Sequence, residues 1–268
     1  MPAESAGWTP APRSPAPPAP APAAARWRAT PSPERSADRR PLRWTLLGLL
    51  LGAANACAQL SASASVASDY RYRGISLSHG DPALQASVAY DDASGLYGGL
   101  FASNVQFAIS PHRQLQAVAY GGYARRLERG LSAEVGATYA AFTGPGTYDY
   151  AEAYAGIAGD ALSARLYYAP RYFGRDSGAW YAELNVSQPL ADRLRLTAHV
   201  GMLANPGGDT IYGQADRRVL DARVGVAIEL EAFTVQLSWV GVASTRAGYP
   251  ISQGERRNTA VAALSRAF

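Results

Sequence analysis

The chain of 268 residues is 48% hydrophobic and only 17% charged, and all 25 of its basic residues are arginine. Residues 1–58 hold seven of these arginines and three of the 21 acidic residues, which leaves 18 of each after residue 58 and a formal net charge of zero. This balance excludes a basic surface for nucleic acid in that part, and the single cysteine, Cys57, excludes an internal disulfide.

Residues 1–38 form a Pro/Ala-rich tract that cannot bury a core, so we expect a disordered extension or a start codon assigned too far upstream. Residues 39–58 have the features of a secretory signal peptide, with arginines before the apolar run WTLLGLLLGAANACA and cleavage expected after Ala58. Acylation of Cys57 and twin-arginine export are the alternatives. The mature protein is then 59–268.

The first predicted strand is Gln59–Arg73, which alternates without interruption over its fifteen residues. One side is small or apolar and ends in Tyr70 and Tyr72, whereas the other is polar and ends in residues such as Asp69 and Arg71. Small residues that become aromatic at one end are typical of a strand that faces lipid near a membrane interface. We therefore expect the tyrosines to face lipid and the charged residues to face a lumen.

Eleven further segments alternate in the same way, in the ranges 84–91, 96–107, 114–125, 131–139, 150–158, 162–168, 180–187, 194–202, 220–230, 233–239 and 258–268. In the third strand the side of Phe101 is the apolar one, although Leu100 lies opposite to it. In the fourth strand Leu115 competes with Val118, and the pattern does not decide which of them faces lipid.

Short turns are expected near residues 92, 127, 160, 190 and 231, and longer loops near 78, 110, 146, 174, 211 and 250. This strict alternation predicts an all-β fold, a 12-stranded antiparallel up-and-down transmembrane β-barrel with short periplasmic turns and longer outer loops. Closure leaves no sheet edge in the membrane. The chain ends on Phe268, as barrels recognised by the outer-membrane assembly machinery commonly do, so we expect that machinery to be a partner.

Three stretches of the chain resemble a known family: SDYRYRGIS at Ser68–Ser76, GDPALQ at Gly80–Gln85 and GLYGGLFASNV at Gly95–Val105. They are similar to the N-terminal signature of the TorF-type outer-membrane porins, and Glu152–Gly156 adds a shorter match. The resemblance implies an outer-membrane β-barrel that acts as a pore, and it implies no particular substrate.

If the apolar sides face lipid, the opposite sides line a lumen that carries charges of both signs. The candidates for lining a pore are Asp69, Arg71, Glu134, Glu152, Arg165, Glu183, Arg195, His199, Asp221 and Arg223. A barrel of twelve strands leaves room for a narrow aqueous path, and opposed arginines and carboxylates would orient small polar or zwitterionic solutes. The alternative is that these groups pair across strands and close the barrel.

The histidines, His79, His112 and His199, show no arrangement of base and nucleophile, so we expect no enzyme, and no spacing indicates a metal or a cofactor. We predict passive diffusion of small polar solutes through the bacterial outer membrane. A closed structural or adhesive barrel that acts through its loops is the alternative, and a soluble periplasmic β-sandwich is a third class. Lipopolysaccharide is a further expected contact, through the loop residues Arg171, Arg175, Arg217, Arg218, Arg246, Arg256 and Arg257.

Overall fold

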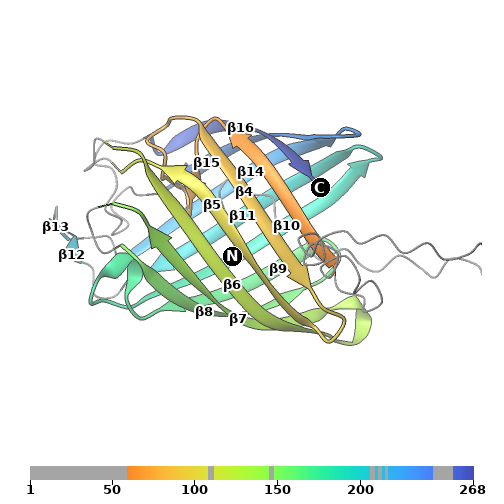
Figure 1. The fold of residues 1–268 in the computed structure, drawn as a ribbon, viewed down its shortest axis with the longest axis horizontal. Coiled ribbons are helices and arrows are strands. Elements are labelled where there is room, and N and C mark those ends of the chain that lie inside the picture. Colours follow the sequence, from red (N-terminus) through yellow and green to blue (C-terminus); the bar gives the residue numbers. More distant parts are fainter. Residues whose placement is uncertain are drawn as a thin grey trace, which may run out of the picture. The chain divides into compact units, whose positions relative to one another are not determined.

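A computed structural model of the chain describes residues 59–107, 112–144, 148–205, 209–210, 213–214, 217–243 and 256–268. Twelve of its strands close into one antiparallel barrel, in the order β1-β16-β15-β14-β11-β10-β9-β8-β7-β6-β5-β4 (Figure 1). The predicted 12-stranded antiparallel barrel is confirmed. The extension and the signal peptide expected in residues 1–58 lie outside the described residues, as does Arg246.

The barrel strands are short and lie close to the predicted ranges. Their bounds are β1 (Gln59–Ala67), β4 (Ala83–Asp91), β5 (Leu96–Val105), β6 (Gln114–Arg126), β7 (Ser132–Phe142), β8 (Tyr150–Ala158), β9 (Leu162–Ala169), β10 (Ala179–Ala191), β11 (Leu194–Ala204), β14 (Arg218–Glu229), β15 (Thr234–Val242) and β16 (Asn258–Ala267). Within the described residues, no helix is both long and apolar enough to cross a membrane.

Short and long connections alternate between the two ends of the barrel, which we call the turn end and the loop end. The turn end holds the five short connections and the 3-10 helix η1 (Glu128–Gly130), and the loop end holds the longer ones. Among the described parts of the longer loops are the 3-10 helix η2 (Tyr172–Gly174) and two small sheets, β2 (Arg71–Tyr72) with β3 (Ile75–Ser76) and β12 (Asp209–Thr210) with β13 (Gly213–Gln214).

The wall of the barrel has an apolar outer face and a more polar inner face. Val224 on β14 and its cross-strand neighbour Trp239 on β15 point outward and are 48% and 46% exposed. On the same two strands, Asp221 and Gln236 point inward and are buried. Large apolar side chains that remain exposed along every other position are expected only where the surroundings are themselves apolar.

In two strands, β5 and β6, the structure shows which side chains point outward and which point into the barrel. In β5 the predicted orientation was wrong, because Leu100 points outward and is exposed whereas Phe101 and Val105 are buried inside. In β6 Leu115 points outward and Val118 inward. Aromatic residues are abundant on both faces of this barrel, so their presence alone does not identify the outer face, and the leucines are the better guide.

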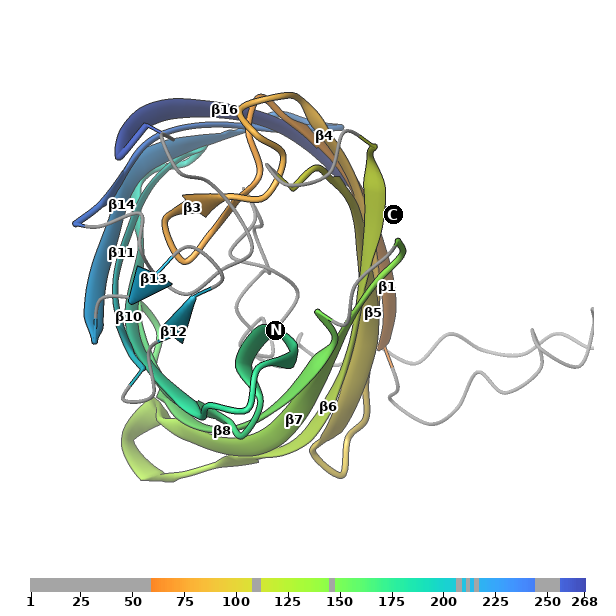
Figure 2. The ribbon, with the colours of Figure 1, turned by 90° about the vertical axis from the view of Figure 1, so that its left-hand side faces the viewer.

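The first predicted strand is wrong over its last six residues. β1 ends at Ala67, and the chain then turns into the lumen, where residues 69–78 form a hairpin around β2 and β3 that lies inside the ring of strands (Figure 2). At the turning point, the Ser68 amide donates to the Ala262 carbonyl at 2.8 Å, and the Ala262 amide donates to Ser68 Oγ at 3.0 Å. The ladder of β1 with β16 therefore has only five register pairs, whereas that of β10 with β11 has eleven.

Candidate functional site: a hairpin inside the lumen

The hairpin of residues 69–78, hereafter the lumen hairpin, is formed by a two-residue turn between Tyr72 and Ile75, which pair with each other. Both turn residues have positive φ, 48° at Arg73 and 78° at Gly74, as a type I′ turn requires. Glycine adopts this conformation freely, but arginine does not. The turn thus places Arg73 at the tip of the hairpin at some cost in backbone strain, on the order of 1–3 kcal/mol, which its contacts must offset.

A buried carboxylate holds the base of the lumen hairpin together. Asp69 Oδ1 accepts hydrogen bonds from Ser76 Oγ at 2.6 Å and from Ser78 Oγ at 3.1 Å, and its Oδ2 pairs with Arg71 Nε at 2.6 Å. The hairpin also bonds to the wall, because the Tyr70 hydroxyl donates to Gln116 Oε1 at 2.6 Å. The hairpin is therefore an ordered unit fixed to the barrel by directional bonds.

The tip of the lumen hairpin presses against the inner wall at Gly74. A Cβ added there would lie 2.7 Å from Cβ of Asp221, which would force one of the two to move, and 3.0 Å from Cβ of Val242, which would be a tight contact. Gly80 has nearly the same φ, 80°, but nothing lies within 4 Å of its Cβ position. The two glycines therefore carry the same backbone requirement and differ only in packing.

We expect Gly74→Ala to destabilise the barrel by more than Gly80→Ala, because both variants incur the strain of a positive φ, about 1–2 kcal/mol, and only Gly74→Ala also displaces the hairpin from the wall. Urea unfolding of the two refolded variants measures the difference. Equal losses of stability in both variants would contradict the close packing at the tip.

At the tip, Arg73 forms a buried ion pair with Glu152 on β8. Its Nη2 lies 2.9 Å from Oε1 and 2.8 Å from Oε2 of that carboxylate, and the two side chains are 3% and 5% exposed. A buried ion pair of this kind is costly to break from one side, because the remaining charge has no partner and little water. This ion pair of Arg73 with Glu152, hereafter the clasp, holds the hairpin tip against the wall.

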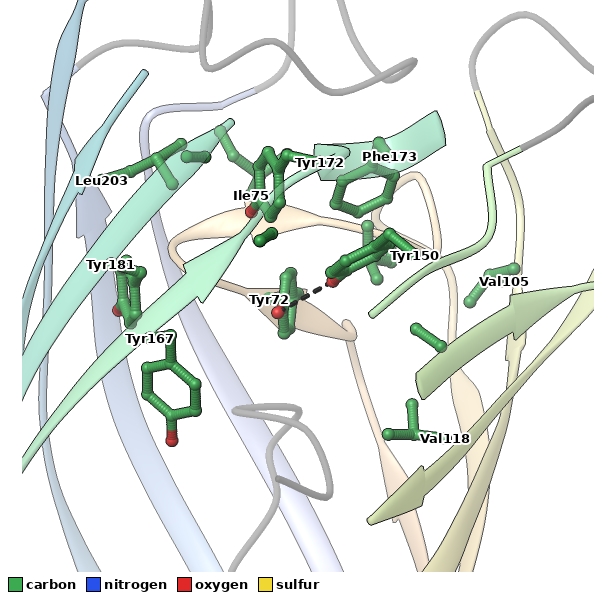
Figure 3. Packing of buried hydrophobic residues seen from close by; sticks show 14 of the residues in the cluster. Tyr72, Ile75, Val105, Val118, Tyr150, Tyr167, Tyr172, Phe173, Tyr181 and Leu203 are labelled. Carbon is green, nitrogen blue, oxygen red and sulfur yellow. Dashed lines mark hydrogen bonds between the residues drawn. The ribbon is translucent and has the colours of Figure 1, made fainter. Parts of the chain in front are cut away.

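Aromatic rings of a buried cluster lie in the lumen near this ion pair, and Figure 3 shows several of them, including Tyr72, Tyr150, Tyr172 and Phe173. The Tyr150 hydroxyl donates to the Tyr72 hydroxyl at 2.9 Å, and the Tyr150 ring stacks on Phe173 of η2 with centroids 4.8 Å apart. Tyr172 meets Tyr150 edge to face at 5.2 Å. The η2 segment, which belongs to the loop between β9 and β10, thus covers the hairpin from the loop end.

Almost no free space remains beside the clasp. The cavity lined by Arg73, Glu152 and their aromatic neighbours has a volume of about 20 Å³, room for about one water molecule. The described residues therefore leave no room for a solute beside the clasp, and a path through this point would require the hairpin to move.

Toward the turn end, the inner wall carries further ion pairs, one of which spans the strand β8 and one of which joins the neighbouring strands β11 and β14. Glu134 on β7 pairs with Arg165 on β9 and accepts a hydrogen bond from the Tyr97 hydroxyl at 2.8 Å. Arg195 and Glu229 pair at 3.1 Å, and both are partly exposed. These groups are less buried than the clasp, so this half of the inner wall is polar and partly accessible.

A second polar cluster connects the wall to the clasp. His199 Nε2 lies 3.0 Å from Asp221 Oδ1 and 3.0 Å from the Tyr181 hydroxyl, while its Nδ1 lies 2.6 Å from Asn185 Oδ1. The Tyr181 ring also lies across Gly201, where a Cβ would collide with its hydroxyl. These contacts fix the orientation of the Tyr181 ring, and the Arg73 guanidinium lies over that ring with its Cζ 4.1 Å from the centroid.

The structure places most of the predicted lumen residues where the strand pattern put them. Eight lie on the inner face of the wall, namely Glu134, Glu152, Arg165, Glu183, Arg195, His199, Asp221 and Arg223. Asp69 and Arg71 are also inside the barrel, but they lie on the lumen hairpin and not on a wall strand, contrary to the prediction. The structure brings Glu152 to Arg73, Glu134 to Arg165 and His199 to Asp221.

Sequence reasoning placed Arg73 on the lumen side of the first strand, near the mouth, and missed both its position at the tip of a hairpin and its tyrosine neighbours. A signal was present, because Arg73–Gly74 between Tyr72 and Ile75 fits a two-residue hairpin turn. Within the part of the chain that the structure describes, no three His, Cys, Asp or Glu side chains are grouped closely enough to hold a metal ion.

The family model of a bacterial protein of unknown function, Gcw_chp, matches residues 52–268. The chain belongs to the Gcw_chp family. The match includes the whole described barrel with its lumen hairpin. No curated protein matches this Gcw_chp chain.

Solved structures to which the chain is similar include a porin and an autotransporter domain. The KdgM porin is 10% identical, with a TM-score of 0.47 over 79% of this chain and 99% of the porin, and a second KdgM porin structure contains disordered oligogalacturonate. The translocator domain of the autotransporter NalP from Neisseria meningitidis is 10% identical, with a TM-score of 0.42 over 84% of this chain and 93% of that domain. Similarity at this level concerns the fold alone.

Proposed function

We propose that this Gcw_chp protein is an outer-membrane channel that passes small polar solutes and that the lumen hairpin is its constriction. The observation that carries the proposal is the difference in polarity between the apolar outer face and the charged inner face of the wall. Val224 and Trp239 are exposed on the outside, whereas partly accessible ion pairs such as Arg195 with Glu229 lie on the inside. An apolar exterior suits hydrocarbon, and a polar interior suits water and polar solutes.

The remaining expectations join this proposal. They are cleavage of a signal peptide after Ala58, delivery by the assembly machinery through Phe268, contact of loop arginines with lipopolysaccharide and membership of the TorF-type porins. Passive transport without enzymatic chemistry is part of the same proposal. The partly exposed inner-wall groups toward the turn end are the surfaces that a solute would meet on the periplasmic side of the hairpin.

A closed barrel with a structural or adhesive role is the second candidate, and the lumen hairpin favours it. The cavity of about 20 Å³ beside the clasp is too small for any solute larger than water. The two candidates differ in whether the hairpin leaves this position. The channel requires an open state, and the closed barrel does not.

Planar bilayer recordings of the refolded protein test the proposal. We expect discrete current steps, with long closed periods because the buried Arg73–Glu152 pair favours the closed hairpin. Liposome swelling with a panel of sugars and amino acids would then define the solutes. If repeated insertions of correctly folded protein gave no steps, the channel would be rejected in favour of the closed barrel.

A further inference from the structure

The guanidinium of Arg73 is surrounded by aromatic faces as well as by a carboxylate. Its Cζ lies 4.1 Å from the ring centroid of Tyr181, 4.9 Å from that of Tyr72, 5.3 Å from that of Tyr172 and 5.4 Å from that of Tyr167. Each distance is within the range at which a cation is attracted to the face of an aromatic ring. One cation thus contacts four rings and the Glu152 carboxylate.

Most of this surround does not belong to the lumen hairpin. Tyr167 and Tyr181 are on the wall strands β9 and β10, Tyr172 is in η2, and Glu152 is on β8. A second carboxylate, Glu183, is buried beside them and accepts a hydrogen bond from the Tyr167 hydroxyl at 3.2 Å. The barrel therefore supplies a cage of rings and carboxylates, and the hairpin supplies the cation that occupies it.

We propose that this cage, formed by Glu152, Glu183, Tyr167, Tyr172 and Tyr181, is a binding site for small organic cations of the guanidinium or quaternary ammonium class. Arg73 is its resident ligand while the hairpin is closed. When the hairpin leaves, a cationic solute in the lumen takes the place of Arg73. This inference rests on the proposed function, because it names the class of solute that the constriction recognises.

The chemistry of the cage favours organic cations over metal ions. Aromatic faces attract weakly hydrated cations with a large surface, and a planar guanidinium also stacks on them. Hard metal ions such as Mg²⁺ require several oxygen ligands in an octahedral arrangement, and among the described residues no three His, Cys, Asp or Glu side chains are grouped closely enough to hold a metal ion. Sugars lack the positive charge that these two buried carboxylates would stabilise.

Removal of the resident ligand gives a direct test by calorimetry on the full chain in detergent. We expect Arg73→Ala to bind added guanidinium and tetramethylammonium saturably, while urea, the neutral counterpart of guanidinium in size and shape, gives no saturable heat. The unmodified protein is expected to bind these cations about tenfold more weakly or worse, because Arg73 must first vacate the cage. Adding Glu152→Gln to Arg73→Ala is expected to abolish the binding.

Arg171→Ala is the matched control, because this arginine lies in the same loop as η2 but is exposed. Its Nε makes a long ion pair, 3.9 Å, with Oδ1 of the exposed Asp176. It should behave like the unmodified protein. Arg73→Gln is the second test variant, because its amide can still donate to Glu152 and preserve the fold. Slower migration of the boiled sample on a gel checks that each variant is folded.

The proposal is overturned if guanidinium and urea give the same heats in folded Arg73→Ala, or if Arg171→Ala gains the same binding. Because calorimetry does not depend on conduction, its outcome separates the two proposals. Saturable binding without current steps would support the cage and reject the channel. Current steps without binding would support the channel and reject the cage.

Discussion

Replacing Glu152 by alanine is expected to lower the free energy of unfolding by about 3–5 kcal/mol, because the buried Arg73 guanidinium would lose the carboxylate that pairs with it at 2.8 Å inside the barrel. The same variant is expected to release the hairpin tip and to lengthen the open periods in bilayer recordings. Urea titration monitored by fluorescence measures the first effect, and single-channel recording measures the second.

The matched control is Asp176→Ala, which removes the carboxylate of an exposed pair with Arg171 at the loop end. Exposed pairs contribute little to stability, so this variant should unfold and conduct as the unmodified protein does. In a double-mutant cycle, Arg73→Ala combined with Glu152→Ala should cost less than the sum of the single changes. Additive losses, or similar behaviour of Glu152→Ala and Asp176→Ala, would show that the clasp does not hold the hairpin.

Replacing Val224 by arginine is expected to lower the stability of the barrel in phospholipid bilayers by about 2–4 kcal/mol, the cost of a cationic side chain at the middle of the hydrocarbon. Val224 lies in the centre of β14 and points outward. Leu190→Arg is the control, because Leu190 is equally apolar and exposed but lies close to the end of β10. There the expected cost is only about 0–1 kcal/mol.

The unfolding free energy of both variants, measured by urea titration in bilayers, decides where the hydrocarbon lies. A penalty that is as large at Leu190 as at Val224 would be inconsistent with a membrane centred on the wall. No penalty at either position would mean that water covers the outer face and would support the soluble β-sandwich class.

The strand pattern predicted the wall because one physical rule governs all of it. Every wall strand must satisfy its backbone within the sheet and present alternate side chains to two different surroundings. The inner positions of Glu134, Arg165 and Asp221 follow from this rule alone. The number of strands and the alternation of short and long connections follow from it as well, which is why the fold could be predicted from the sequence.

The lumen hairpin could not be predicted in this way, because alternation persists after the chain has left the wall. Tyr70 and Tyr72 continue the phase of the outward residues of β1, yet both are buried in the lumen. The alternation of residues assigns each side chain to one of two faces of a strand. It does not show whether that strand belongs to the barrel wall or to a hairpin inside the barrel. The turn at Arg73–Gly74 was the only local signal that the strand reverses, and its contacts with Glu152 and Tyr181 depend on residues far away in the chain.

Since β1 leaves the wall at Ser68, the cylinder has a weak line between its first and last strands. The part of β16 from Asn258 to Ala262 remains paired with β15, but among the described residues its backbone ladder with β1 has already ended, and Ser68 bonds to Ala262 there. Thermal breathing or mechanical load should part the tube along this line before any other, and amides of β1 should exchange with solvent sooner than those of β10 or β11. A molecule leaving the lumen sideways, into the surrounding bilayer, would meet its lowest barrier here.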